Sequence, residues 1–175
     1  LTSVTITSVK EVGDFAFAGC IKLSSITLGK LTTIGDYAFH NTKLTETHDL
    51  SGVSYIGAYA YAETPLTSVV IPNGITVGEG AFRDCPKLAT VKIGNDVKLG
   101  TDAFRFNNMM YGNYTSDFYE IEEKGVKKKI YYYVYLSPLT SLEIGNNVEI
   151  GDSAFYGCAK LTSITLGEGA KIGNY

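Results

Sequence analysis

An apolar–polar–apolar pattern, LxxIxL, recurs along the chain at intervals close to 22 residues. Its last three letters have the two-residue period of a strand that buries one face, and their β-branched residues suit a pleated surface. The pattern therefore predicts a series of short strands that share one core. Its copies begin at Leu1, Leu23, Leu66, Leu88, Leu139 and Leu161.

A second pattern, IGxxAF, follows the strand pattern with the same period. The intervals between its final aromatic residues are 22, 22, 21, 22 and 51 residues, and 51 is one ordinary interval plus 29. The sequence therefore predicts one repeating unit of about 22 residues with a single insertion between Phe104 and Leu139. The aromatic residues are Phe17, Phe39, Tyr61, Phe82, Phe104 and Phe155, and a shortened copy closes at Tyr175.

Stacked copies of this unit can bury apolar residues that one copy cannot. Each unit would add a short parallel strand, and its AF pair would enter a column beneath the sheet. We therefore expect residues 1–175 to form one leucine-rich-repeat solenoid of about seven rungs. It would be a right-handed coil, with short parallel β-strands on one face, turns and short helical segments on the other, and one inserted β-hairpin. The copy LTETHDL at Leu44 has one extra residue, which predicts a bulge.

The insertion, residues 107–138, differs from the repeats in composition. Its segment YEIEEKGVKKKIYYYVY alternates like two strands about a turn at residues 124–125. This predicts a protruding hairpin in which Glu122 faces Lys127 and Glu120 faces Lys129. Its tyrosines would either form a recognition surface or pack over the solenoid, and both alternatives stay open. They are seven of the thirteen in the chain: Tyr111, Tyr114, Tyr119, Tyr131, Tyr132, Tyr133 and Tyr135.

The combination of LTSITL with IGDSAFYGC resembles the BspA-like leucine-rich repeats, whose unit has the form CxxLxxIxIPxxVxxIGxxAFxxC. The resemblance covers everything except the insertion, although proline follows the strand pattern only once, at Pro72. Such proteins are mostly secreted or surface-anchored products of host-associated bacteria and some protozoan parasites. Adhesion to host matrix proteins is their usual proposed role. The resemblance thus implies an extracellular or cell-surface location and a binding role.

Charge and composition exclude several classes of partner. The formal net charge is −3, and acidic residues between 117 and 123 offset the four lysines between 124 and 129. Nucleic-acid binding depends on neutralising phosphates, so we expect no nucleic-acid partner. No run of apolar residues is long enough to predict a membrane span.

Candidate catalytic groups are few. His40 and His48 occupy different positions of neighbouring units, and no serine or cysteine has a recognisable base in a matching motif. Cys20, Cys85 and Cys158 all stand three residues after the repeat aromatic, on rungs too far apart for a disulfide. We therefore expect free thiols, no enzymatic activity, no cofactor and no metal site.

Two surfaces are candidates for binding: the outward face of the strands and the hairpin. The favoured hypothesis is a secreted or cell-surface module that binds a protein or a glycan. The alternative is a passive spacer that displays other domains of a longer protein. Both terminal rungs lack polar caps and have unpaired strand edges, so we also expect the natural protein to continue and this chain to self-associate end to end. The candidate residues are His48, Lys92, Glu143, Tyr119, Tyr131, Tyr132, Tyr133 and Tyr135.

Overall fold

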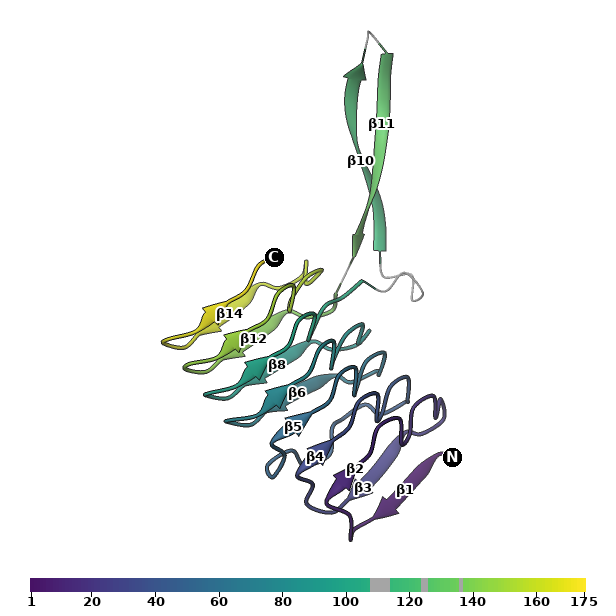
Figure 1. Ribbon diagram of the computed structural model, residues 1–175. Helices are drawn as coiled ribbons and strands as arrows, with labels where there is room; N and C mark the ends of the chain where they lie inside the picture. The colour runs from purple at the N-terminus through teal and green to yellow at the C-terminus, as the bar shows by residue number, and fades with distance from the viewer. Residues whose placement is uncertain (108–113, 124–125, 136) are drawn as a thin grey trace.

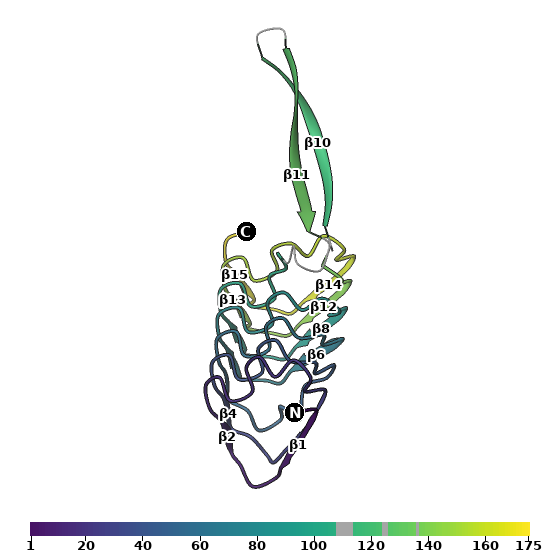
Figure 2. The ribbon, with the colours of Figure 1, turned by 90° about the vertical axis from the view of Figure 1, so that its right-hand side faces the viewer.

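The computed structural model describes residues 1–107, 114–123, 126–135 and 137–175, and residues 114–123 and 126–135 are described through their backbone only. The repeats form a solenoid with two parallel sheets on opposite sides (Figures 1 and 2). The first is made by the LxxIxL segments, which form β1 (Ser3–Ile6), β3 (Ser25–Leu28), β6 (Ser68–Ile71), β8 (Thr90–Ile93), β12 (Ser141–Ile144) and β14 (Ser163–Leu166).

The second sheet contains seven two-residue strands in the order β15-β13-β9-β7-β5-β4-β2. The sequence pattern does not predict this sheet, because two residues are too few to show an alternation. From the second rung onward, the glycine after each of these strands is required by close stacking, since a Cβ on Gly57 would overlap the backbone of Gly35. The strands are β2 (Glu11–Val12), β4 (Thr33–Ile34), β5 (Tyr55–Ile56), β7 (Thr76–Val77), β9 (Lys98–Leu99), β13 (Glu149–Ile150) and β15 (Lys171–Ile172).

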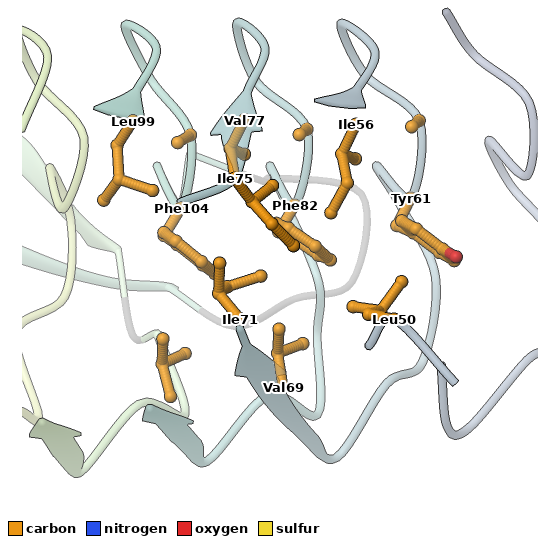
Figure 3. Close-up of a cluster of buried hydrophobic side chains, with 14 of the residues drawn as sticks. Leu50, Ile56, Tyr61, Val69, Ile71, Ile75, Val77, Phe82, Leu99 and Phe104 are labelled. Atoms are coloured by element: carbon orange, nitrogen blue, oxygen red, sulfur yellow. The ribbon is translucent and has the colours of Figure 1, made fainter. Parts of the chain in front are cut away.

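The core between the sheets contains the predicted aromatic column. Neighbouring rings lie 5.1 to 5.5 Å apart between centroids and are stacked (Figure 3). Phe39, Phe82 and Phe104 are buried as predicted, whereas Phe155, in the last complete rung, is half-buried. Of the leucines that begin the strand patterns, Leu1 is exposed and Leu161 is half-buried, and the other four are buried: Leu23, Leu66, Leu88 and Leu139. The column confirms the alignment of the repeats.

The short helical segments that we expected are not confirmed: turns stand in their place throughout the described residues. Two residues in most repeats have a left-handed backbone, for example Tyr59 with φ 53° and Glu63 with φ 59°. A right-handed helix cannot continue through such residues. A segment that contains two of them four positions apart therefore forms turns.

The insertion forms the predicted hairpin, made of β10 (Tyr114–Glu123) and β11 (Val126–Tyr135). Both views show its ribbon extending away from the solenoid (Figures 1 and 2). The predicted turn at residues 124–125 lies outside the described residues. The strands before and after the insertion, β8 and β12, pair in register, so the ladder continues past it.

Candidate binding surfaces

The outward face of the first sheet carries Lys92 and Glu143 side by side, as predicted. Lys92 Nζ lies 2.8 Å from Glu143 Oε2, and both side chains are exposed. Exposed ion pairs contribute little free energy, and here each charge neutralises the other. Interfaces draw most of their energy from Trp, Tyr and Arg, and no outward position on the six strands described for this sheet holds one.

His48 does not belong to this outward row, so that prediction is wrong. Its ring points into the core, with centroids 5.8 Å from Phe39 and 6.2 Å from Tyr61. Residues 44–50 form no strand, and the first sheet is divided into β1-β3 and β6-β8-β12-β14. The predicted bulge is therefore a complete break. The extra residue shifts the register by one position, which turns an outward residue inward.

His48 and Tyr61 share a hydrogen bond of 2.9 Å between Nδ1 and Oη. Burial raises the pKa of Tyr61 well above its usual value, so the hydroxyl keeps its proton, and the tautomer of His48 decides which of the two groups donates. Burial lowers the pKa of His48 to about 4, opposed only in part by the nearby Asp49 carboxylate. The imidazole is therefore neutral at pH 7, and its role is to pack and form a hydrogen bond in the core.

The three cysteines are free thiols, as predicted. Cys85 is buried, and its Sγ donates to the carbonyl oxygen of Tyr61 at 3.3 Å. Burial raises the pKa of the Cys85 thiol to about 12, so it is not a nucleophilic thiolate at neutral pH. Cys20 and Cys158 are half-buried at the equivalent place in their own repeats.

Among the described residues, no group of three or more His, Cys, Asp or Glu could hold a metal ion. Nor does any described helix have the length and apolar character to cross a membrane.

The hairpin pairs in the predicted register, with Glu120 opposite Lys129 and Glu122 opposite Lys127. Its charged positions lie toward the tip, and its tyrosine-rich positions lie in the half nearer the solenoid (Figure 1). The candidate tyrosines occupy both strands. Tyr119 pairs with Ile130, and Tyr131, Tyr132, Tyr133 and Tyr135 pair with Phe118, Asp117, Ser116 and Tyr114.

A third surface, along the turns of the IGxxAF motifs, was not predicted to bind. It begins with an external stack of rings, separate from the core column. Phe15 and Tyr37 lie 4.9 Å apart, and Tyr37 and Tyr59 lie 5.0 Å apart. The stack ends at Gly80, where a Cβ would lie 2.5 Å from the Tyr59 ring.

Beside this stack is a depression that we call the turn-edge hollow, which encloses about 320 Å³. The Tyr59 hydroxyl donates to Glu79 Oε1 at 2.8 Å, which fixes its ring at the rim. His40 Nε2 lies 3.7 Å from Glu63 Oε1. The hollow is lined by Tyr37, His40, Tyr59, Ala62, Glu63, Arg83 and Asp84.

Both arginines of the chain lie on this same edge. Arg83 contacts Asp84 at 3.2 Å and Asp102 at 3.3 Å, and Arg105 contacts Asp102 at 3.1 Å. The Arg105 guanidinium lies 4.7 Å from the centre of the Tyr156 ring, within the range of a cation–π contact. The network also reaches the start of the insertion, because Asp84 Oδ1 accepts the backbone N–H of Asn107 at 2.6 Å.

A signal for this edge exists in the sequence, at the variable letters of IGxxAFxx. The position before AF is Phe, Tyr, Tyr, Gly, Asp and Ser in successive copies, and the position after it is Ala, His, Ala, Arg, Arg and Tyr. These positions do not repeat, so periodicity assigns them no role. Variable aromatic and charged positions at the turns of a regular scaffold are instead typical of a binding surface.

Among solved structures, a leucine-rich repeat protein from Bacteroides ovatus ATCC 8483 is similar, with a TM-score of 0.64 and 22% identity over 98% of this chain and 42% of its own. A leucine rich cell surface protein from Faecalibacterium prausnitzii A2-165 gives a TM-score of 0.36 and 18% identity over 95% of this chain and 60% of its own. The chain thus spans less than two thirds of either protein. No curated protein matches it.

The family profile described as BspA type leucine rich repeat region matches residues 1–111 and 116–175, in six copies. The match includes both repeated patterns that build the two sheets and the aromatic column. This chain therefore belongs to the BspA-type leucine-rich repeat family.

Proposed function

We propose that this chain is a non-catalytic binding module that engages a protein partner through its hairpin. The observation that carries the proposal is the hairpin itself, in which two ten-residue strands extend away from a regular solenoid (Figure 1). The solenoid does not need these residues to continue its ladder, because β8 and β12 pair directly across the insertion. Segments that a scaffold carries without structural need are where recognition residues concentrate.

The composition of the hairpin supports recognition of a protein. Positions 131, 133 and 135 lie two residues apart on β11, the spacing that places residues on one side of a strand. Tyrosine gives a large contact area with few rotamers to restrict, and it is enriched at interface hot spots. The alternating residues of the solenoid strands offer mainly Ser and Thr outward.

We place this module on a secreted or cell-surface protein that adheres to host or matrix proteins. Family membership supports this, and the leucine-rich-repeat solenoid is a typical non-enzymatic scaffold for protein interaction. The runner-up is a passive spacer. The unbroken aromatic column and the continuous second sheet favour it, because both would stiffen the solenoid as a rod.

Replacing Tyr131, Tyr133 and Tyr135 with Ser tests the proposal. We expect the triple variant to lose adhesion to immobilised basement-membrane matrix while its melting temperature stays within about 2 °C of the parent. The matched control replaces the same tyrosines with Phe, which keeps the rings and should retain most of the adhesion.

A triple Ser variant that adheres like the parent but melts several degrees lower would show that these tyrosines stabilise the fold, and the proposal for the hairpin would fail. A parent that does not adhere would favour the spacer. Adhesion of the parent that is unchanged after removal of residues 110–137 would show that the hairpin is not the binding surface.

A further inference from the structure

The turn-edge hollow exists because one row of side chains along the turns contains a gap. The residue after each AF pair belongs to this row, and Ala62 stands in it between His40 and Arg83. The short side chain leaves a space of about 320 Å³ between two long ones. Small-molecule sites begin at roughly 300 Å³, so the hollow has the size for one small ligand rather than for a folded partner.

Hydrogen-bonding groups stand at both ends of this space. At one end, 3.7 Å separates His40 Nε2 from Glu63 Oε1, which is longer than a hydrogen bond, so both groups keep capacity for a ligand. At the other end, Arg83 donates from Nε to Asp84 and from Nη1 to Asp102, and its guanidinium has further N–H groups that these two bonds do not use. The lining therefore offers both donors and acceptors, and the two carboxylates hold Arg83 in place before a ligand arrives.

The charges of the lining select against a charged ligand. A cation would meet the Arg83 guanidinium, and an anion would meet the carboxylates of Glu63 and Asp84. The remaining wall is formed by Tyr37, Tyr59 and Ala62, which supply aromatic and aliphatic carbon. A matching ligand is neutral, has an apolar frame, and carries groups that both donate and accept. Hydroxyl groups do both.

We propose that the turn-edge hollow binds a neutral sugar unit of a glycan. Ring hydroxyls would bond with Glu63, His40 and Arg83, while the C–H face of the sugar would lie against the tyrosine edges and Ala62. This site is separate from the hairpin proposed above to bind a protein. It does not depend on that proposal, because its lining lies on the second, third and fourth rungs.

The experiment is an NMR titration of the uniformly labelled 175-residue chain with neutral methyl glycosides of glucose, galactose, mannose and N-acetylglucosamine. At least one should shift the backbone amides of residues 37–40, 59–63 and 83–84, and leave those of β14 unchanged. A ligand of this size in an open site should have a dissociation constant of about 1 to 10 mM. The same titration with lysine amide and with methyl glucuronide tests the charge selection.

Two variants identify the site. Ala62→Tyr should abolish the shifts by filling the hollow with a side chain that the same row accepts at Tyr156. The matched control is Ala18→Tyr, in the same row outside the hollow, which should bind like the parent. Glu63→Gln keeps the shape of the side chain and should weaken binding about tenfold.

Three outcomes would overturn the proposal. The first is that no neutral glycoside shifts these amides at about 50 mM, which is about five times the upper limit of the expected dissociation constant. The second is that lysine amide or methyl glucuronide binds more tightly than every neutral sugar, and the third is that both Ala62→Tyr and Glu63→Gln bind like the parent. Removal of residues 110–137 should leave sugar binding intact, so failure of the hairpin proposal and failure of this one are distinguishable.

Discussion

At the scale of single residues, three departures from the repeat pattern explain one another. The third copy has Tyr61 where the other core rings are Phe, His48 in the strand segment, and one extra residue between Leu44 and Leu50. A buried tyrosine hydroxyl needs a hydrogen-bond partner. The extra residue turns His48 inward, where its Nδ1 meets that hydroxyl at 2.9 Å. The extra residue thus accounts both for the polar pair in the core and for the break in the first sheet.

This pair makes stability depend on pH. The pKa of His48 is about 4 in the folded chain against 6.5 for a free histidine. Because the unfolded chain binds the proton first, the stability from this site is complete above pH 6.5, declines as the pH falls toward 4, and is lost below it. The total loss is about 3 kcal/mol. Urea unfolding between pH 7.5 and 4 measures it.

The control for this prediction is the double variant His48→Val with Tyr61→Phe, which restores the residue types of the other rungs. Carboxylates that titrate below pH 5 affect both proteins, so the difference between their pH profiles isolates His48. Identical pH profiles of the free energy of unfolding would show that protonation of His48 does not destabilise the fold, contrary to what its burial predicts.

At the scale of elements, the sequence predicts segments that are long enough to show an alternation. The first sheet and the aromatic column were predictable because each rung carries the same apolar residues, and the hairpin because its own residues alternate. The second sheet recurs in every rung but was missed, because two residues show no alternation. The inward turn of His48 was not predictable, since counting from Leu44 places it outward, and one extra residue reverses every later position. The turn-edge hollow was also missed, because it depends on Ala62 having longer neighbours in space, which become neighbours only after stacking.

The core column leads to a prediction about Phe82. Its ring is buried and stacks between Tyr61 at 5.4 Å and Phe104 at 5.1 Å. Phe82→Ala removes that volume from the middle of the stack and should lower the free energy of unfolding by about 3 to 5 kcal/mol. The matched control is Phe15→Ala in the external stack, where the ring is 61% exposed and the cost should be about 1 kcal/mol. Equal effects of the two variants in chemical denaturation would contradict the assignment of the core.

At the scale of the whole molecule, the stacking that builds the interior continues to both terminal rungs. Among the described strands, β1 pairs on one side only, with β3, and β14 pairs only with β12. The last rung also leaves apolar side chains uncovered: Ile164 is 56% exposed and Ile172 is 65% exposed. These two residues line an apolar depression of about 190 Å³ that includes Phe155, the last ring of the core column. Inside the chain, the equivalent surface of each rung is covered by the next rung.

The 175-residue chain should therefore associate end to end, with β14 of one copy beside β1 of another in the register that β1 and β3 already use. Association should be weak in dilute solution and rise with concentration, because only one rung face is buried per contact. Sedimentation from about 10 μM to 1 mM should show a growing average mass.

Replacing Ile164 and Ile172 with Lys should hold the chain monomeric over that range, since a charge cannot be buried unpaired in the apolar depression. The matched control replaces Thr27 and Thr165, outward on the sheet, with Lys and should associate like the parent. A parent that remains strictly monomeric at 1 mM, or a lysine variant at positions 164 and 172 that associates equally well, would show that the terminal rungs do not pair.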